Sequence, residues 1–202
     1  MFIVLEGIDG SGKTTIARRL AEHLSREHRV FLTEEPTRSW LGAAVRRAIE
    51  EEKNPYSQAL LFFADRAEHV EVIKRHMQNG EIVISDRYVY STYAYQGAQI
   101  ESFMPIEKAL EWLEGVYAPM RLDPDLVILL TIEPRRGLGF VSNRNFREKF
   151  EQEEFLSHVQ EIYLKLADKY SFKIVDSNRN IDEVFEEIRK IVESALKFKN
   201  EI

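Results

Sequence analysis

Residues 7–15, with the sequence GIDGSGKTT, constrain the fold of this chain more than any other segment. They match the phosphate-binding pattern G-x-x-x-x-G-K-[ST], in which Gly7, Gly12, Lys13 and Thr14 hold the fixed positions. Glycines at these positions let backbone N–H groups converge on phosphate oxygens, and a following helix directs the positive end of its dipole toward them. Phosphate binding of this kind therefore requires a strand, a glycine-rich turn and a helix in that order.

The flanking sequence supplies both partners of this loop. The apolar run Phe2–Leu5 precedes it and predicts a buried strand, and the stretch from Lys13 to about His28 predicts a helix. We expect the loop to cradle the phosphates of a nucleoside triphosphate such as ATP. The residues expected to contact it are Gly7, Ile8, Asp9, Gly10, Ser11, Gly12, Lys13, Thr14 and Thr15.

Segments typical of strands and of helices alternate along the chain. This alternation predicts an α/β fold with a five-stranded parallel sheet and helices on both faces. The expected strands are Phe2–Glu6, Val30–Thr33, Ile82–Ser85, Leu126–Thr131 and Phe172–Val175. The expected helices are Lys13–His28, Leu41–Glu51, Pro55–Gln78, Ile106–Tyr117, Glu153–Tyr170 and Ile181–Lys197.

The composition limits the classes of function. The chain has 202 residues, of which 44% are hydrophobic, enough for one domain with a sizeable core. A net charge of -6 argues against a general nucleic-acid binder, and no apolar run is long enough to span a membrane. The absence of cysteine excludes disulfides and thiolate metal sites. Because a strand is predicted from Phe2 onward, we expect no signal peptide and a cytoplasmic location.

Two segments depart from the regular pattern. Residues 59–64 are apolar around the whole helix, which predicts burial on more than one side, against the core and against a ligand or a second subunit. Residues 133–149 are polar, contain Gly137 and Gly139, and carry four arginines: Arg135, Arg136, Arg144 and Arg147. Such a segment is either a solvated surface loop or a basic lid that closes over phosphates.

The end of the third predicted strand indicates what the nucleotide is used for. Lys13 can reach the oxygens of a transferring phosphate, and we expect Thr14, together with Asp86 through water, to hold Mg²⁺. Arg87 follows Asp86 at the carboxyl edge of the sheet, where its guanidinium matches phosphate geometry. An arginine at this place favours a second, phosphorylated substrate and hence a small kinase. The alternative is that Arg87 forms a structural salt bridge. The guanine-reading motif Asn-Lys-x-Asp of GTPases is absent.

Four motifs that follow one another in this order resemble thymidylate kinases. They are EGIDGSGKTT (6–15), EPT (35–37), LFFADR (61–66) and DRYVYSTYAYQG (86–97). The resemblance extends from residue 2 to about residue 170. It implies a P-loop nucleoside monophosphate kinase that transfers the γ-phosphate of ATP, with Mg²⁺, to dTMP to form dTDP. It also implies one domain over residues 1–202, with a short mobile lid at about 133–150, and a homodimer.

The resemblance further implies the residues that bind dTMP. Asp9 matches the carboxylate that binds the 3′-hydroxyl of the acceptor sugar, and Phe62 matches the phenylalanine that stacks on thymine. The other implied contacts are Arg38 and Arg87 for the monophosphate, Arg66 for a base carbonyl, and Thr92, Tyr95 and Gln96 for base N3 and the sugar edge. Judged by residue type alone, these side chains could instead serve packing, an Asx turn at Asp9 or a solvated surface at Arg38.

Lys13 and Arg87 are the expected catalytic residues, together with an arginine of the lid. Some thymidylate kinases carry arginine at the position of Gly10, so we expect the lid to supply this charge here, from Arg144 or Arg147. The five histidines show no metal-ligand spacing with acidic partners, and we expect none of them to be catalytic.

Two other functions remain open at this point. One is a kinase of the same fold that acts on another nucleotide, such as UMP or dUMP, or on a deoxynucleoside. The other is a nucleotide-binding protein without kinase activity. Turnover with dTMP and ATP would distinguish them.

Overall fold

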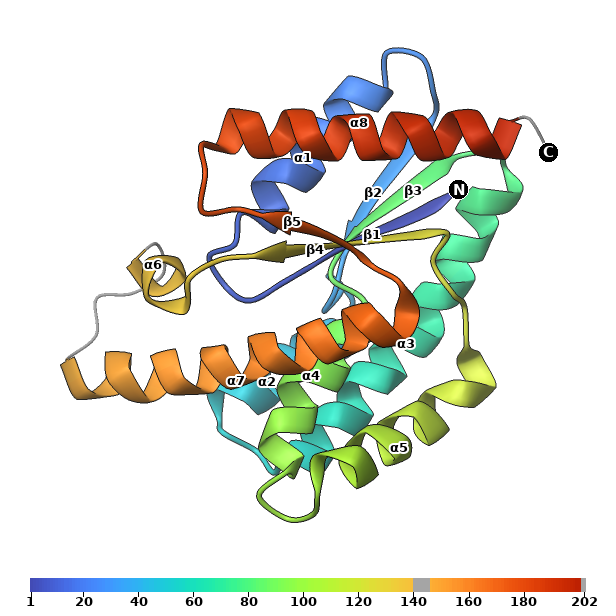
Figure 1. The fold of residues 1–202 in the computed structure, drawn as a ribbon. Helices are drawn as coiled ribbons and strands as arrows, with labels where there is room; N and C mark the ends of the chain where they lie inside the picture. The colour runs from blue at the N-terminus through green and yellow to red at the C-terminus, as the bar shows by residue number, and fades with distance from the viewer. Residues whose placement is uncertain (140–145, 201–202) are drawn as a thin grey trace.

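The computed structural model describes residues 1–139 and 146–200, and the side chains of residues 1–137 and 152–198. Strands and helices alternate along this part of the chain (Figure 1). The elements are β1 (Phe2–Glu6), α1 (Lys13–Leu24), β2 (Val30–Glu34), α2 (Trp40–Glu50), α3 (Pro55–Gln78), β3 (Ile82–Asp86), α4 (Val89–Ile100), α5 (Ile106–Tyr117), η1 (Ala118–Met120), β4 (Leu126–Thr131), α6 (Pro134–Gly139), α7 (Phe146–Tyr170), β5 (Lys173–Asp176) and α8 (Ile181–Asn200).

The sheet has five strands in the order β2-β3-β1-β4-β5, and all its pairs are parallel. The central strand β1 pairs Leu5 with Asp86 of β3 on one side and with Ile128 of β4 on the other. Strands buried on both faces appear in the sequence as short apolar runs, as β1 and β4 do. The predicted fold class is confirmed, and no strand bound differs from the prediction by more than one residue.

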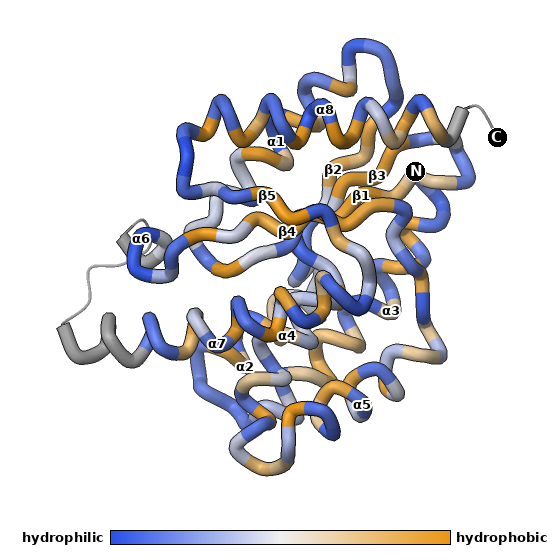
Figure 2. The backbone as a smooth tube through the Cα atoms, viewed as in Figure 1, coloured by the Kyte–Doolittle hydropathy of each residue, from blue (hydrophilic) through white to orange (hydrophobic). Residues whose placement is uncertain are grey.

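Helices cover both faces of the sheet (Figure 1). Along β1, Ile3 and Leu5 pack toward the face covered by α1 and α8, and Phe2 and Val4 pack toward the face covered by α3, α4, α5 and α7. This alternation is the two-residue period of a strand. Figure 2 shows the apolar strands between two layers of helices whose outer surfaces are more polar.

Some helices differ in extent from the prediction. Helix α1 ends at Leu24 rather than near His28, α7 begins at Phe146 rather than Glu153, and residues 134–139 form α6. Helix α3 has the predicted bounds and packs against α2, α4, α5 and β3. It is buried on several sides, as expected, but not around its whole circumference, because Leu60 is 50% exposed.

Helix α4 was not expected from the sequence. Its first residues, Val-Tyr-Ser-Thr-Tyr, are aromatic or β-branched apart from serine and have low helix propensity, and Tyr88 at the N-cap makes no side-chain capping bond. Instead, the Glu6 carboxylate at the end of β1 accepts hydrogen bonds from the backbone N–H groups of Tyr88 (2.9 Å) and Ser91 (3.2 Å). A carboxylate from a different element therefore caps α4 and complements its dipole.

Glu6 also joins α4 to α7. It is fully buried, and its Oε2 accepts hydrogen bonds from the hydroxyls of Ser91 (2.6 Å) and Tyr163 (2.9 Å). Burial raises the pKa of Glu6 to about 6, although these hydrogen bonds and the charge of Arg87 act to lower it. The end of β1 is thereby fixed to both helices.

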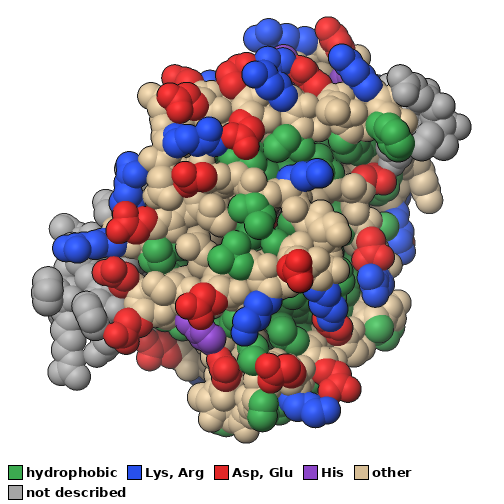
Figure 3. Space-filling model, in the orientation of Figure 1, with side chains coloured by type: hydrophobic (Ala, Val, Ile, Leu, Met, Phe, Trp, Pro, Cys, Tyr) green, Lys and Arg blue, Asp and Glu red, His purple; other side chains and the backbone are tan. Residues whose placement is uncertain are grey.

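The surface carries many charges. Figure 3 shows acidic and basic side chains interspersed over one face, with apolar side chains between them. Several pairs lie within one helix, such as Lys74 with Glu71 in α3, and exposed pairs of this kind contribute little to stability. Among the helices of the described residues, none is both long and apolar enough to cross a membrane.

The buried Glu6 carboxyl leads to a prediction about stability and pH. Because its pKa is raised from 4.5 to about 6 in the folded protein, the folded state binds this proton more readily than the unfolded chain between these pH values. The free energy of unfolding of the wild type, relative to Glu6→Gln, should therefore fall by about 2 kcal/mol as the pH rises from about 4 to about 7. Urea denaturation of both proteins measures this difference, and a difference independent of pH would contradict it.

Candidate active site

The sequence motifs meet at the carboxyl edge of the sheet, where β1 and β3 end side by side. A cavity of about 850 Å³ opens at this edge. Its walls come from residues 9–15, residues 34–36, Asp86 with Arg87, and positions between Ser177 and Ile181. The predicted nucleotide-binding loop therefore lies in one cavity with the strand-end acid and arginine.

The phosphate-binding loop is packed backbone to backbone against its neighbours. Gly7 and Gly10 have φ angles of 145° and 79°. A Cβ at Gly7 would lie 2.3 Å from the carbonyl oxygen of Leu130 in β4, and a Cβ at Gly10 would lie 2.3 Å from that of Gly137 in α6. Glycine is therefore required at both positions. The loop leads directly into α1 at Lys13, so the N-terminal end of this helix faces the position expected for the phosphates.

Lys13 is buried within this loop. Its Nζ donates hydrogen bonds to the carbonyl oxygen of Ile8 (2.7 Å) and to the hydroxyl of Ser11 (3.3 Å). Burial, with a smaller contribution from Arg87, lowers the pKa of Lys13 to about 7. Phosphate oxygens beside Nζ would favour its charged form, so phosphate binding and protonation of Lys13 support each other.

Arg87 is held by the phosphate-binding loop and by helix α4. Its φ angle of 72° places it in the left-handed region, which is uncommon for a residue with a side chain and is often found at functional sites. Nη1 donates to the carbonyl oxygen of Gly7 (3.0 Å) and the hydroxyl of Ser91 (3.0 Å), and Nη2 donates to Asp9 Oδ1 (2.6 Å). The guanidinium carbon lies 5.2 Å from the centroid of the Tyr95 ring. The salt bridge considered as the alternative role of Arg87 is therefore present, and it lies inside the site.

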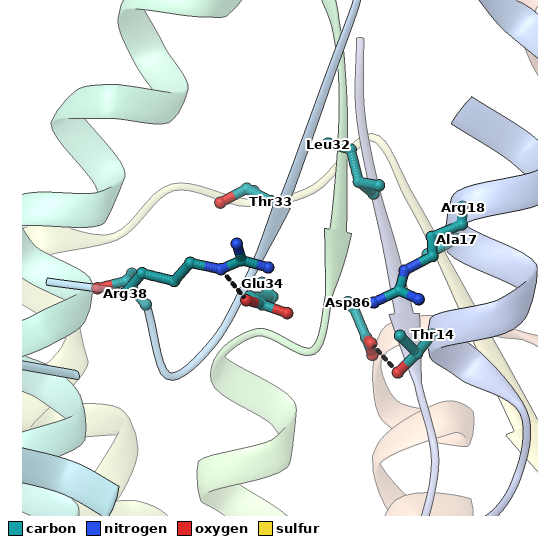
Figure 4. A pocket seen from close by; sticks show the side chains of 9 residues that line it. Thr14, Ala17, Arg18, Leu32, Thr33, Glu34, Arg38 and Asp86 are labelled. Atoms are coloured by element: carbon teal, nitrogen blue, oxygen red, sulfur yellow. Dashed lines mark hydrogen bonds and ion pairs between the residues drawn. The ribbon is translucent and has the colours of Figure 1, made fainter. Parts of the chain in front are cut away.

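Thr14 and Asp86, the expected metal contacts, are neighbours (Figure 4). The Thr14 hydroxyl donates a hydrogen bond to Asp86 Oδ2 at 2.5 Å. Asp86 Oδ1 is buried and has no hydrogen-bond partner among the described residues. Oxygen donors of this kind suit Mg²⁺, which takes few protein ligands and completes its coordination with water and substrate phosphates. Within the same residues, no group of three or more His, Cys, Asp or Glu is arranged to hold a metal ion.

Arg38 does not lie with Arg87. Its side chain is 85% exposed, and its Nε donates to Glu34 Oε1 at 2.8 Å. It lines a smaller cavity of about 370 Å³, which shares Thr14, Glu34 and Asp86 with the larger one. Figure 4 shows Arg38 turned toward Glu34, across from Thr14 and Asp86.

Arg46 shares the larger cavity with Arg87 instead. It lies on α2, and its Nη1 donates to the carbonyl oxygen of Pro36 at 3.1 Å. It was not singled out from the sequence, because an arginine on the exposed face of an amphipathic helix is ordinary. Its place in this cavity depends on how the loop after β2 packs on α2.

Helices α3 and α4 bring four expected residues together. Arg66 is 1% exposed and its Nη2 donates to the hydroxyl of Thr92 at 2.9 Å, and Gln96 follows Thr92 by one turn. Phe62 lies one turn before Arg66 and is half-buried, whereas its neighbour Phe63 packs in the core and is 2% exposed.

Two buried polar atoms in this group have no hydrogen-bond partner in the part of the chain that the structure describes. They are Nη1 of Arg66, which can only donate, and Oε1 of Gln96, which accepts. Because buried polar groups are normally paired, an unpaired donor near an unpaired acceptor indicates a place for a ligand.

The other end of the cavity lies beside β5. Ser177, Arg179 and Ile181 line it, and Arg136 of α6 donates from Nη1 to the carbonyl oxygen of Asn178 at 2.8 Å. Of the lid arginines expected to act in catalysis, Arg144 lies outside the described residues. Arg147 lies in α7, and its side chain is outside the described ones.

Comparisons with known proteins agree with these motifs. The family model described as thymidylate kinase matches residues 5–188. A probable thymidylate kinase of Methanococcoides burtonii is 39% identical over 197 residues, which cover 96% of each chain. Probable thymidylate kinases of Methanosarcina mazei and Thermococcus onnurineus are 41% and 38% identical, over 97% of this chain and 95% and 98% of theirs. The resemblance found in the motifs is confirmed, and this chain belongs to the thymidylate kinase family.

Proposed function

We propose that this protein transfers the γ-phosphate of ATP to dTMP and forms dTDP. Membership of the family supports the reaction, and the unpaired donor of Arg66 beside the unpaired acceptor of Gln96 supports the acceptor base. Thymine offers the matching edge, because its O4 accepts a hydrogen bond and its N3–H donates one. Cytosine offers an amino donor and a ring-nitrogen acceptor at these positions and would leave both protein groups unpaired.

The other acceptor contacts follow from the same geometry. The half-buried ring of Phe62 is available to stack on the base. Asp9 and Tyr95 meet where the loop touches α4, with the Asp9 N–H donating to the Tyr95 hydroxyl at 3.0 Å, and we assign them to the sugar. We assign the 5′-phosphate to Arg87 and Arg46, because both guanidinium groups line the larger cavity.

The chemical step needs no general base, because the attacking oxygen of dTMP is already anionic. It attacks the γ-phosphorus in line with the leaving oxygen. Lys13 and the backbone N–H groups of the loop stabilise the charge that spreads over the transferring group. Thr14 and Asp86, the latter through water, would hold Mg²⁺, which would neutralise part of the charge of the phosphates.

The remaining assignments rest on the resemblance and the sequence. We propose one domain over residues 1–202, with residues 133–150 as a lid that supplies cationic charge from Arg144 or Arg147 and excludes water. We also propose a cytoplasmic location, since the reaction consumes ATP and the chain contains no cysteine.

Arginine substitutions test these phosphate contacts. Arg87→Ala should lower kcat/KM for dTMP at least about a hundredfold and Arg46→Ala about tenfold, because each removes charge-assisted hydrogen bonds to phosphate. Arg47→Ala is the matched control, since Arg47 is exposed and paired with Glu51, and it should stay within about twofold of the wild type. A coupled assay with dTMP and ATP measures all four proteins. Equal activities of Arg46→Ala and Arg47→Ala would refute the role of Arg46, and an inactive wild type would refute the function.

We propose a homodimer formed through exposed apolar side chains. Leu60 on α3 and Phe103 after α4 are 50% and 59% exposed, and Tyr56, one turn before Leu60, lies 5.7 Å from Phe103 between ring centroids. An apolar surface of this kind suits a symmetric interface. Sedimentation velocity at micromolar concentration should show dimers for the wild type and monomers for Leu60→Glu. Wild-type monomers would contradict the proposal.

A further inference from the structure

Arg66 has a buried counterion. A guanidinium that is 1% exposed needs an opposite charge inside the protein, and Glu35, with a side chain 3% exposed, supplies it. Glu35 Oε2 accepts hydrogen bonds from Arg66 Nε (2.9 Å) and Nη2 (2.6 Å). With the bond from Nη2 to Thr92 added, Nε and Nη2 are both engaged, and Nη1 is the nitrogen without a partner among the described residues.

His69 holds the second oxygen of the same carboxylate. It lies three residues after Arg66 on α3 and is 4% exposed. Its Nδ1 lies 2.8 Å from Glu35 Oε1, and its Nε2 lies 2.7 Å from the hydroxyl of Thr33 on β2. A carboxylate can only accept, so Nδ1 carries a proton and donates it to Glu35, and the other ring nitrogen shares a hydrogen bond with the Thr33 hydroxyl. Hydrogen bonds therefore run without a break from Thr33 through His69 and Glu35 to Arg66.

We propose that Glu35 and His69 are positioning residues that fix Arg66 for recognition of the acceptor base. The inference rests on the proposed function. Without His69, Glu35 Oε1 would lose its donor, and the carboxylate could turn about its soft terminal torsion. Both bonds to Arg66 would move with it, and Nη1 would lose its direction relative to Gln96. Hydrogen bonds weaken steeply when misaligned, so base binding would suffer while the groups around the transferring phosphate stay in place.

The test separates binding from chemistry. His69→Leu fills the same space without a donor and should raise KM for dTMP about tenfold, with kcat and KM for ATP within about twofold of the wild type. His69→Asn, whose amide nitrogen can take the place of Nδ1, should restore KM to within about threefold. His76→Leu is the matched control on α3, since His76 contacts Glu81 and stacks on Phe31 instead. A His69→Leu KM equal to that of the control, or a fall in kcat alone, would overturn the proposal.

A double-mutant cycle tests whether His69 acts through Arg66. In an Arg66→Met background, adding His69→Leu should raise KM for dTMP by less than about twofold, because the group it positions is already gone. A further tenfold increase would overturn the proposal. Thr33→Val provides a second route if His69→Leu does not fold. This substitution removes the hydrogen bond between the Thr33 hydroxyl and His69 Nε2, and it should raise KM for dTMP about threefold. An unchanged KM for dTMP would again count against the proposal.

Calorimetric titration of dTMP distinguishes this proposal from the proposed function. If the wild type does not bind dTMP, the assignment of the acceptor fails. If the wild type binds dTMP and His69→Leu binds it equally well, the positioning role fails and the function stands. The expected result is tight binding by the wild type and about tenfold weaker binding by His69→Leu, in line with the kinetic change.

Discussion

The buried carboxylate of Glu6 is the interaction on which the rest of the site depends. Glu6 is the last residue of the central strand. Its carboxylate caps α4 from outside that helix and accepts hydrogen bonds from the hydroxyls of Ser91 and Tyr163. Ser91 in turn accepts a hydrogen bond from Arg87, and α4 carries Thr92, Tyr95 and Gln96 into the acceptor region. One charged group therefore places Arg87 and helix α4 relative to the loop at the end of β1.

Several polar groups of the site find only some of their hydrogen-bond partners within the described residues. Arg66 and Arg87 each have a carboxylate partner, which keeps cationic side chains in place without ligand. Arg66 Nη1, Gln96 Oε1 and Asp86 Oδ1 are buried without a hydrogen-bond partner in the described residues. Leaving such atoms unpaired costs stability, and substrates and Mg²⁺ that pair with them regain it on binding. In the proposed function, the acceptor base therefore meets groups on α3 and α4, and the metal meets a group at the end of β3.

Local patterns were sufficient to predict the sheet, the phosphate-binding loop and the bounds of α3, because glycines, apolar runs and helical spacing encode them directly. Helix α4 could not be predicted in the same way, since its cap comes from Glu6, 82 residues before Tyr88. The same holds for Arg46 and for His69, which nothing in the sequence separates from other surface arginines and buried histidines. For Arg38, the resemblance implies a contact with the monophosphate, and in the structure its exposed side chain pairs with Glu34, four residues earlier.

In the proposed function, the buried donor of Arg66 and the buried acceptor of Gln96 read the edge of thymine. Steady-state kinetics with dTMP, dUMP, UMP and dCMP tests it most directly. The account predicts the highest kcat/KM for dTMP, and a value about ten-thousandfold lower for dCMP, because cytosine leaves both protein groups unpaired. A dCMP value within about tenfold of dTMP would contradict the reading of this edge. A dUMP or UMP value about tenfold above dTMP would contradict the assignment of the acceptor.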